Sequence, residues 1–266
     1  MQLKYAISRS FSIPAVALIF FLVGWYGVCK LFAIDKLILP LPTDVFLALM
    51  NDFTSLLKHG GITLMEAILG FLVGGGAGFI LGSLFYFFTF IRQALYPYAI
   101  ALKAVPLIAL APLIVVWCGT GLLSKVVLAA IISFFPILVN TVQGLASVET
   151  EALDLMATLS ASRWQIFKKL SLPHALPSIF AGMKISCTFA VVGAVVAEFI
   201  GATEGIGYVI KSTSYYFDTD AMFAGIFIAA LTGLIFFSII SILQDKIVFW
   251  HKENNMHEMF RRGGAD

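Results

Sequence analysis

Residues 147–177 read SVETEALDLMATLSASRWQIFKKLSLPHALP and form a polar stretch between two long apolar segments. Hydrophobic residues make up 60% of the whole chain, so a polar stretch of this length stands apart from the rest. Polar backbone groups need partners, so such a stretch is either disordered or folded against something. Because residues that typically start helices recur along it, we predict an ordered segment that another protein binds.

The composition predicts a helical membrane protein. Mean hydropathy is +0.98 and only 12% of the residues are charged. Several apolar runs exceed about 18 residues, the length expected of a bilayer-spanning helix, and they lack the period-two alternation of a membrane barrel. Cys29, Cys118 and Cys187 stand singly, without metal-site spacing. We therefore expect an all-α polytopic membrane protein with no metal site.

We expect about six transmembrane helices. The first follows Lys4 and Arg9, and its apolar run is too long for the core of a signal peptide, so we interpret it as a retained span. Pro97, Pro106 and Pro112 interrupt the third, where each proline bends the helix and frees a backbone carbonyl. The predicted spans are residues 13–32, 62–90, 96–117, 125–145, 179–200 and 221–243.

Basic residues predict the orientation of these spans. Lysine and arginine concentrate in the segments that share a side with the N-terminus, including Arg163, Lys168 and Lys169. Cytoplasmic loops of membrane proteins carry such an excess. We therefore predict that both termini, the 147–177 loop and the 244–266 tail are cytoplasmic, and that residues 1–266 form a single transmembrane domain.

The spans contain glycines at regular spacing and a few charged residues. Gly70, Gly74 and Gly78 recur every four residues, a spacing that favours close helix packing, with a sliding surface as the alternative. Charged residues at membrane depth are costly and often functional. Lys103 either extends its ammonium group to the inner surface or lines a solute path. Glu198 either lines such a path or caps a packing contact.

The 147–177 loop has the pattern of two short amphipathic helices. Apolar residues at helical spacing give the first helix one face, and a break follows at Ser160. Ser162 and Gln165 then form a capping-box pattern for the second helix, which we expect Pro173 to end. On amphipathicity alone, the pair can lie in lipid headgroups or in a groove of a soluble partner. The apolar face of the first helix comprises Ala152, Leu155, Met156 and Leu159.

The loop resembles the EAA loop of ABC-importer permeases. That pattern is an acidic residue, two small residues, three of any kind, glycine, nine of any kind, and I-x-L-P. Here Asp154 takes the acidic position, and Leu155 and Met156 take the small ones. Ser160 stands in place of the glycine and Leu170 in place of the isoleucine, while Leu172 and Pro173 complete the pattern.

The resemblance extends over most of residues 39–245. LPLPTDVF at 39–46, AVPLIALAPLIVVWCGTG at 104–121 and VVAEFIGATEGIGYVI at 195–210 are similar to the branch that imports nitrate, taurine and other sulfonates. Relatives in this branch also carry vitamin precursors. The resemblance implies a type I importer permease in a bacterial cytoplasmic (inner) membrane, with a second permease copy as partner. A cytoplasmic ATPase dimer and an external solute-binding protein would complete the transporter, and nucleic acid would have no role.

The resemblance also assigns roles to residues. Asp154, Ser160, Arg163, Leu172 and Pro173 would form or position the ATPase contact, and Leu155, Met156 and Leu159 would enter the ATPase groove. Segments 35–58 and 201–220 would dock the binding protein, and Lys103 and Glu198 would lead the candidates for the path. ATP and Mg²⁺ would be bound by the partner, because the glycine-rich GGGAGFILGS has no lysine of a phosphate-binding loop.

Two other classes of protein remain as alternatives. A secondary transporter would need no ATPase and often shows inverted repeats, which are not visible in the sequence. An intramembrane enzyme would need catalytic groups inside the spans, yet all four histidines lie outside the predicted ones. We expect a transporter subunit with no catalytic residues and no cofactor of its own.

Overall fold

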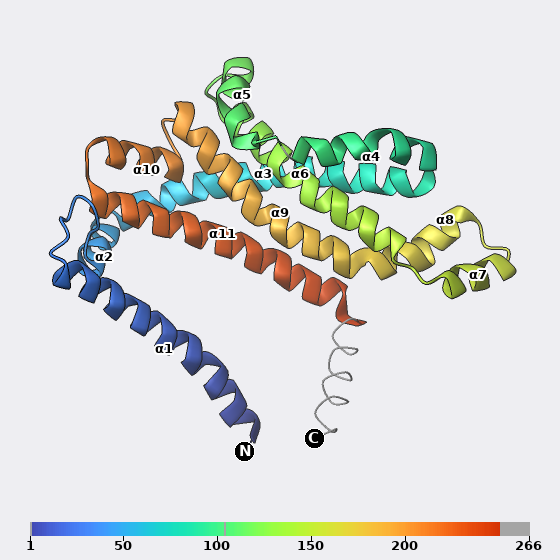
Figure 1. Ribbon diagram of the computed structural model, residues 1–266, viewed down its shortest axis with the longest axis horizontal. Helices are drawn as coiled ribbons and strands as arrows, with labels where there is room; N and C mark the ends of the chain where they lie inside the picture. The colour runs from blue at the N-terminus through green and yellow to red at the C-terminus, as the bar shows by residue number, and fades with distance from the viewer. Residues whose placement is uncertain (1, 104, 251–266) are drawn as a thin grey trace.

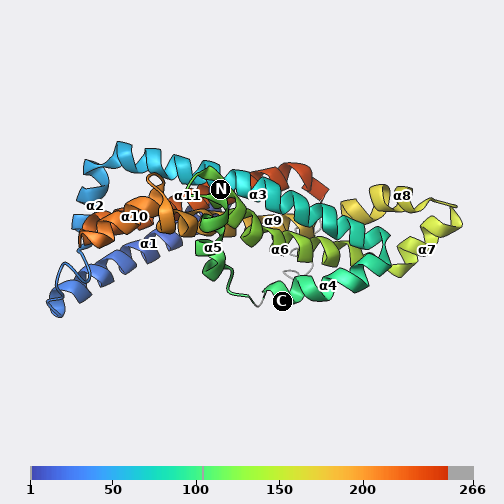
Figure 2. The same ribbon diagram turned by 90° about the horizontal axis from the view of Figure 1, so that it is seen from above.

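The computed structural model describes residues 2–103 and 105–250, and every regular element in these ranges is helical. Four long helices lie side by side along the molecule (Figures 1 and 2). They are α3 (Phe53–Phe87), α6 (Leu122–Ala146), α9 (Leu172–Gly201) and α11 (Thr219–Ile247). Each contains a stretch long and apolar enough to cross a membrane. The predicted second, fourth, fifth and sixth spans are therefore confirmed as helices of spanning length.

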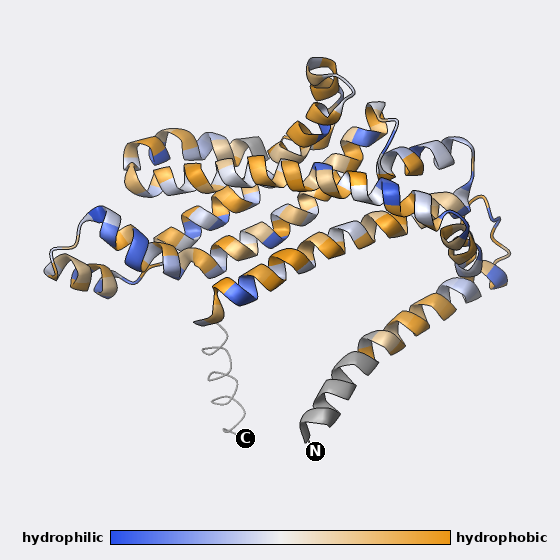
Figure 3. Ribbon diagram, turned by 180° about the vertical axis from the view of Figure 1, so that it is seen from behind, coloured by the Kyte–Doolittle hydropathy of each residue, from blue (hydrophilic) through white to orange (hydrophobic). Residues whose placement is uncertain are grey.

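Two pairs of shorter helices lie at opposite ends of this bundle. The pair α2 (Pro42–Asn51) and α10 (Ile206–Tyr215) covers one end, and α7 (Thr150–Thr158) and α8 (Arg163–Ile166) project at the other (Figure 1). The long helices are mostly hydrophobic, and hydrophilic residues are prominent at α8 and at the end of α11 (Figure 3). This distribution is what a bilayer around the middle of the bundle requires.

The first and third predicted spans differ from the other four. Helix α1 (Gln2–Leu31) diverges from the bundle (Figure 1), and its apolar part, Ala15–Leu31, is shorter. The third span is broken into α4 (Thr89–Lys103), a 3₁₀ turn at Leu107–Leu110 and α5 (Ala111–Cys118). Pro97 stays inside α4, whereas Pro106 precedes the 3₁₀ turn and Pro112 lies in the first turn of α5, where a missing N–H costs no helical bond.

Small residues bring α3, α6 and α9 into close contact. A methyl group at Gly74 of α3 would overlap the backbone carbonyl of Ala130 in α6, and one at Gly78 would lie 2.6 Å from the Phe134 oxygen. Gly193 of α9 meets α6 in the same way, against Ala129. The glycine repeat therefore serves close helix packing, the first of the two interpretations of its spacing.

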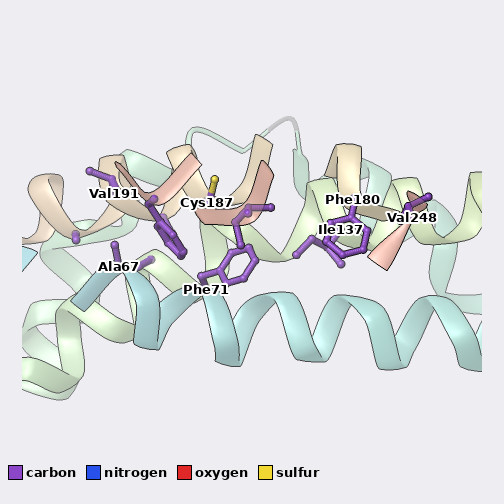
Figure 4. Packing of buried hydrophobic residues seen from close by; sticks show 12 residues of the cluster. Ala67, Phe71, Ile137, Phe180, Cys187, Val191 and Val248 are labelled. Atoms are coloured by element: carbon purple, nitrogen blue, oxygen red, sulfur yellow. The ribbon is translucent and has the colours of Figure 1, made fainter. Parts of the chain in front are cut away.

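Larger apolar side chains fill the space around these contacts. Figure 4 shows Phe71 of α3, Ile137 of α6, and Phe180 and Cys187 of α9 within one buried cluster. The Phe71 ring meets the Phe236 ring of α11 edge to face, with centroids 5.2 Å apart, a preferred aromatic geometry. This core holds α7 and α8 at one end of the bundle and α10 at the other.

Candidate functional site

Helix α7 presents its most exposed apolar residues away from the bundle. The side chains of Leu155 and Leu159 are 61% and 69% exposed, and Asp154 beside them is exposed as well. Met156 is half-buried, as is Leu153, which lines a cavity of about 220 Å³ between α7 and the bundle. The predicted single apolar face is therefore divided, because Met156 lies partly against the protein, whereas Leu155 and Leu159 are exposed.

The predicted break at Ser160 is confirmed and has a defined geometry. Ser160 has a φ of +54°, in the left-handed region that favours glycine. Its N–H donates to the Ala157 carbonyl at 2.9 Å, and the Ala161 N–H donates to the Met156 carbonyl at 3.0 Å. This bond pattern is a Schellman motif, which usually has glycine where Ser160 stands. The chain therefore makes the glycine-type turn with a serine.

The capping box at the start of α8 is confirmed. The Gln165 N–H donates to Ser162 Oγ at 3.3 Å, and the Ser162 N–H donates to Gln165 Oε1 at 2.7 Å. The two bonds satisfy backbone donors that the first turn of a helix leaves without partners. They hold the start of the second helix directly after the Ser160 turn.

The prediction that Pro173 ends this helix is wrong. Helix α8 continues through a π-helical turn at Phe167–Ser171 into α9, so that Arg163–Gly201 is one continuous helical segment. The wider turn shifts the hydrogen-bond ladder, and Pro173 then occupies the first turn of α9, where proline is tolerated. Leu172 and Pro173 are half-buried against the bundle, whereas Arg163 is exposed.

An aromatic cluster joins this segment to the end of α3. The Trp164 ring stacks on those of Phe87 and Phe167, with centroids 5.9 and 5.5 Å away. The Tyr86 hydroxyl and Ser171 Oγ form a hydrogen bond of 2.9 Å beside it. Sequence reasoning missed the cluster, because Tyr86 and Phe87 lie far from Trp164 in the chain and no local pattern links them.

At the other end of the bundle, Glu198 is fully buried in α9. Its Oε1 accepts the Thr63 hydroxyl at 2.7 Å, and its Oε2 accepts the Gly207 N–H at 2.5 Å. The Thr63 oxygen in turn accepts the Ile206 N–H at 2.8 Å. Of the two interpretations of Glu198, this geometry favours the capped packing contact. Lys103 is the last residue of α4, and its side chain lies outside the described residues.

These bonds hold the N-terminus of α10. Three successive N–H groups, those of Gly205, Ile206 and Gly207, donate to His59 Nδ1, Thr63 Oγ1 and Glu198 Oε2. A helix begins with unpaired donors, and here side chains of α3 and α9 satisfy them. Helix α10 is therefore fixed to two long helices through side chains as well as through the chain itself.

Charged and aromatic residues lie at the end of the bundle near α10. The Lys36 ammonium contacts Asp220 at 2.6 Å and Asp44 at 3.6 Å, and the Asp220 hydrogen bond holds the pKa of Lys36 above its usual value. The Tyr215 and Phe217 side chains are 80% and 75% exposed, with Tyr216 between them. Exposed aromatic residues beside charges are typical of surfaces that bind proteins.

Together, the four helices of spanning length and the projecting α7–α8 segment define a polytopic membrane protein. Within the described residues, no cluster of three or more histidine, cysteine or carboxylate side chains could hold a metal ion. The family model described as "Binding-protein-dependent transport system inner membrane component" matches residues 74–249. The chain belongs to this family, and it is a permease subunit of an ABC importer rather than an enzyme.

Several relatives cover most of the chain. The formylaminopyrimidine transport permease protein ThiX of Halalkalibacterium halodurans is 35% identical over 81% of this chain and 87% of its own length. The riboflavin transport system permease protein RibX of Chloroflexus aurantiacus is 35% identical over 88% of each chain. The putative aliphatic sulfonates transport permease protein SsuC of Bacillus subtilis is 33% identical over 93% of this chain and 89% of its own.

The fold also resembles a solved structure. A chain of the MetNI methionine ABC transporter, in an inward-facing conformation, superposes with a TM-score of 0.62 at 20% identity. The match covers 74% of this chain and 95% of the other. The family and this likeness confirm the predicted type I importer fold and an inner-membrane, polytopic subunit. In this family, a separate partner protein binds ATP. The family implies an ATPase and a binding protein as partners of the permease.

Proposed function

We propose that this permease imports a small anionic or heteroaromatic molecule, such as a sulfonate, taurine, nitrate or a vitamin precursor. The relatives that support this proposal include transporters named for formylaminopyrimidine, riboflavin and aliphatic sulfonates. The choice among these molecules rests with the external binding protein, which would deliver the substrate to the outer end of the bundle.

The α7–α8 segment is the proposed contact with the ATPase. The observation that carries this assignment is the continuous helical segment Arg163–Gly201, because a displacement of α8 is passed directly into a spanning helix. The exposed Asp154, Leu155 and Leu159 supply an apolar and acidic surface for the partner. Ser160 and Arg163 position or extend this surface, while Met156, Leu172 and Pro173 anchor it to the bundle.

The remaining arrangement follows from the same proposal. Two copies of the chain form the path, with α7, α8 and both termini in the cytoplasm and α2 and α10 outside. The ends of α2, α10 and α11 dock the binding protein through the Lys36 ion pairs and the exposed aromatic residues 215–217. Lys103, at the broken third span, stays a candidate residue of the path, whereas Glu198 is proposed to act by positioning α10.

The test is copurification of the ATPase subunit with the complete permease. Asp154→Arg is expected to reduce ATPase recovery and substrate-stimulated ATP hydrolysis at least tenfold, because it places a bulky cation on the proposed contact. Lys211→Glu, an opposite charge change at an exposed residue of α10, serves as the control and should leave ATPase recovery unchanged. Equal recovery with both variants would disprove the assignment.

A further inference from the structure

A buried cluster of three charged side chains lies inside the bundle near α10. Glu66 of α3, Lys125 of α6 and Glu198 of α9 are 2%, 8% and 0% exposed. Lys125 Nζ lies 3.5 Å from Glu66 Oε1. Thr63, whose hydroxyl bonds Glu198 Oε1 at 2.7 Å, lies one helical turn before Glu66 on α3, so the Glu66 and Glu198 carboxyl groups are neighbours. Three spanning helices therefore bring two carboxyl groups together with one ammonium group.

The charges of this cluster do not balance if both carboxyl groups are ionised. Two carboxylates and one ammonium group would leave one net negative charge in the protein interior, which is costly without a partner. Among the residues whose burial is described, Lys125 is the one buried cation. His59 of α3 accepts the Gly205 N–H through Nδ1, and the nearby Lys58 and Glu204 are exposed. Two ionised carboxylates in contact would also repel each other.

The hydrogen bonds show which carboxyl group is the acceptor. Both oxygens of Glu198 accept, one from the Thr63 hydroxyl and one from the Gly207 N–H. The Thr63 oxygen accepts the Ile206 N–H and lies 2.7 Å from Glu198 Oε1 but 3.2 Å from the His59 carbonyl oxygen, so the shorter contact directs its hydrogen to Glu198. Accepting at both oxygens is the pattern of an ionised carboxylate.

Glu66 shows the opposite pattern. Its Oε2 is buried and has no hydrogen-bond partner when treated as an acceptor, a costly state for a carboxylate oxygen. The 3.5 Å separation between its Oε1 and Lys125 Nζ is also longer than the roughly 2.7–2.9 Å of a charge-assisted hydrogen bond. A proton on Glu66 would turn the contact with Glu198 into a hydrogen bond and balance the cluster.

We propose that the Glu66–Glu198 pair is a proton-binding site. The proton stays on the Glu66 carboxyl group, whose O–H donates a hydrogen bond to the Glu198 carboxylate. The proton leaves Lys125 and Glu198 as the two opposite charges of a neutral cluster. It also keeps Glu198 ionised at the N-terminus of α10, where a negative charge is favourable. The proposal concerns the folded subunit and does not depend on the substrate or on the ATPase.

Isosteric variants of the purified full-length protein test this proposal. Glu66→Gln replaces the proposed O–H by an amide N–H and should fold with an almost unchanged thermal midpoint. Glu198→Gln removes the acceptor charge and sets an amide donor against the Thr63 hydroxyl or the Gly207 N–H, so its midpoint should fall by several degrees. Infrared difference spectra at neutral pH should show a buried carboxylic acid C=O band in the natural protein that is absent in Glu66→Gln.

The outcomes separate the proposal from a purely structural ion pair. If Glu66 were an ionised partner of Lys125, Glu66→Gln would lower the thermal midpoint as much as Glu198→Gln does. The natural protein and Glu66→Gln would then show the same carboxylic acid C=O bands. Either result overturns the proposal, and so does a Glu66→Gln variant that fails to fold. If Glu198→Gln fails to fold, the spectrum and midpoint of Glu66→Gln alone decide.

Discussion

At the scale of single residues, Ser160 occupies the position at which the EAA-loop pattern has glycine. The left-handed conformation at φ +54° is the same one that glycine adopts at helix C-termini. A residue with a Cβ pays about 1–2 kcal/mol for this conformation, and the two Schellman hydrogen bonds around Ser160 offset part of that cost. The turn is therefore a point of backbone strain within the proposed ATPase contact.

Ser160→Gly should relieve this strain and stabilise the α7–α8 turn by about 1 kcal/mol. Ser160→Val should have the opposite effect, because a β-branched side chain is a poor fit to a positive φ. Hydrogen exchange of the 157–163 amides measures the local stability, and coupled ATP hydrolysis reports the functional effect. Similar exchange rates in the two variants would contradict the proposed role of the backbone conformation.

Gly205 offers a second residue-scale test, at the N-terminus of α10. Its φ is +100°, and a methyl group there would overlap the Glu198 carboxylate. Gly205→Ala should therefore destabilise the protein by more than about 2 kcal/mol, through both strain and overlap. Gly119→Ala is the matched control, because Gly119 also has a positive φ but has nothing within 4 Å of the added methyl group. Equal losses of thermal stability in the two variants would mean that overlap with Glu198 does not contribute to the effect of Gly205→Ala.

At the scale of elements, small residues decide how closely the long helices pack. The face of α3 that carries Gly70, Gly74, Gly78 and Gly82 lies against α6, and a side chain at any of these positions would meet an α6 atom. Lipid-exposed helices gain little from apolar burial alone, so such close contacts carry much of the association. The continuous Arg163–Gly201 segment, with the stacked Trp164, then links this packed core to the projecting end.

Gly74→Ala and Gly76→Ala form a matched pair that tests this packing. The Gly74 methyl group would overlap the Ala130 carbonyl, so we expect a loss of about 1–3 kcal/mol from overpacking. Gly76 on the same helix has nothing within 4 Å, so alanine there should be neutral or slightly stabilising through its higher helix propensity. Thermal unfolding in detergent measures both, and a loss at Gly76 that matched the loss at Gly74 would contradict the packing assignment.

At the scale of the whole molecule, the two ends of the bundle carry different surfaces. One end holds the apolar and acidic face of α7, and the other holds the Lys36 ion pairs and the exposed aromatic residues near α10. The long helices separate these surfaces along the longest dimension of the molecule (Figure 1). Partners that bind both surfaces would therefore act from opposite sides of a membrane.

Cysteine labelling in intact cells tests the proposed orientation. In a background with Cys29, Cys118 and Cys187 replaced by alanine, Tyr215→Cys should react with a membrane-impermeant maleimide added outside. Leu159→Cys should react only after the cells are permeabilised. Both positions are highly exposed in the subunit alone, at 80% and 69%, so in cells that express the permease without its partners their accessibility differs only by side. Labelling of Leu159→Cys in intact cells would reverse the orientation and contradict the assignment of α7 to the ATPase.

The class of this protein follows from its amino-acid pattern alone, because long apolar runs have few ways to satisfy their backbone polar groups other than as membrane helices. Local signals also placed the Ser160 break and the Ser162–Gln165 capping box, since the atoms of such motifs are close in the chain. Other features became visible only in the folded protein. The helix continues through Pro173 into a span, Trp164 stacks on Phe87, and Glu66, Lys125 and Glu198 meet. Those outcomes depend on how distant helices pack, which no local pattern encodes.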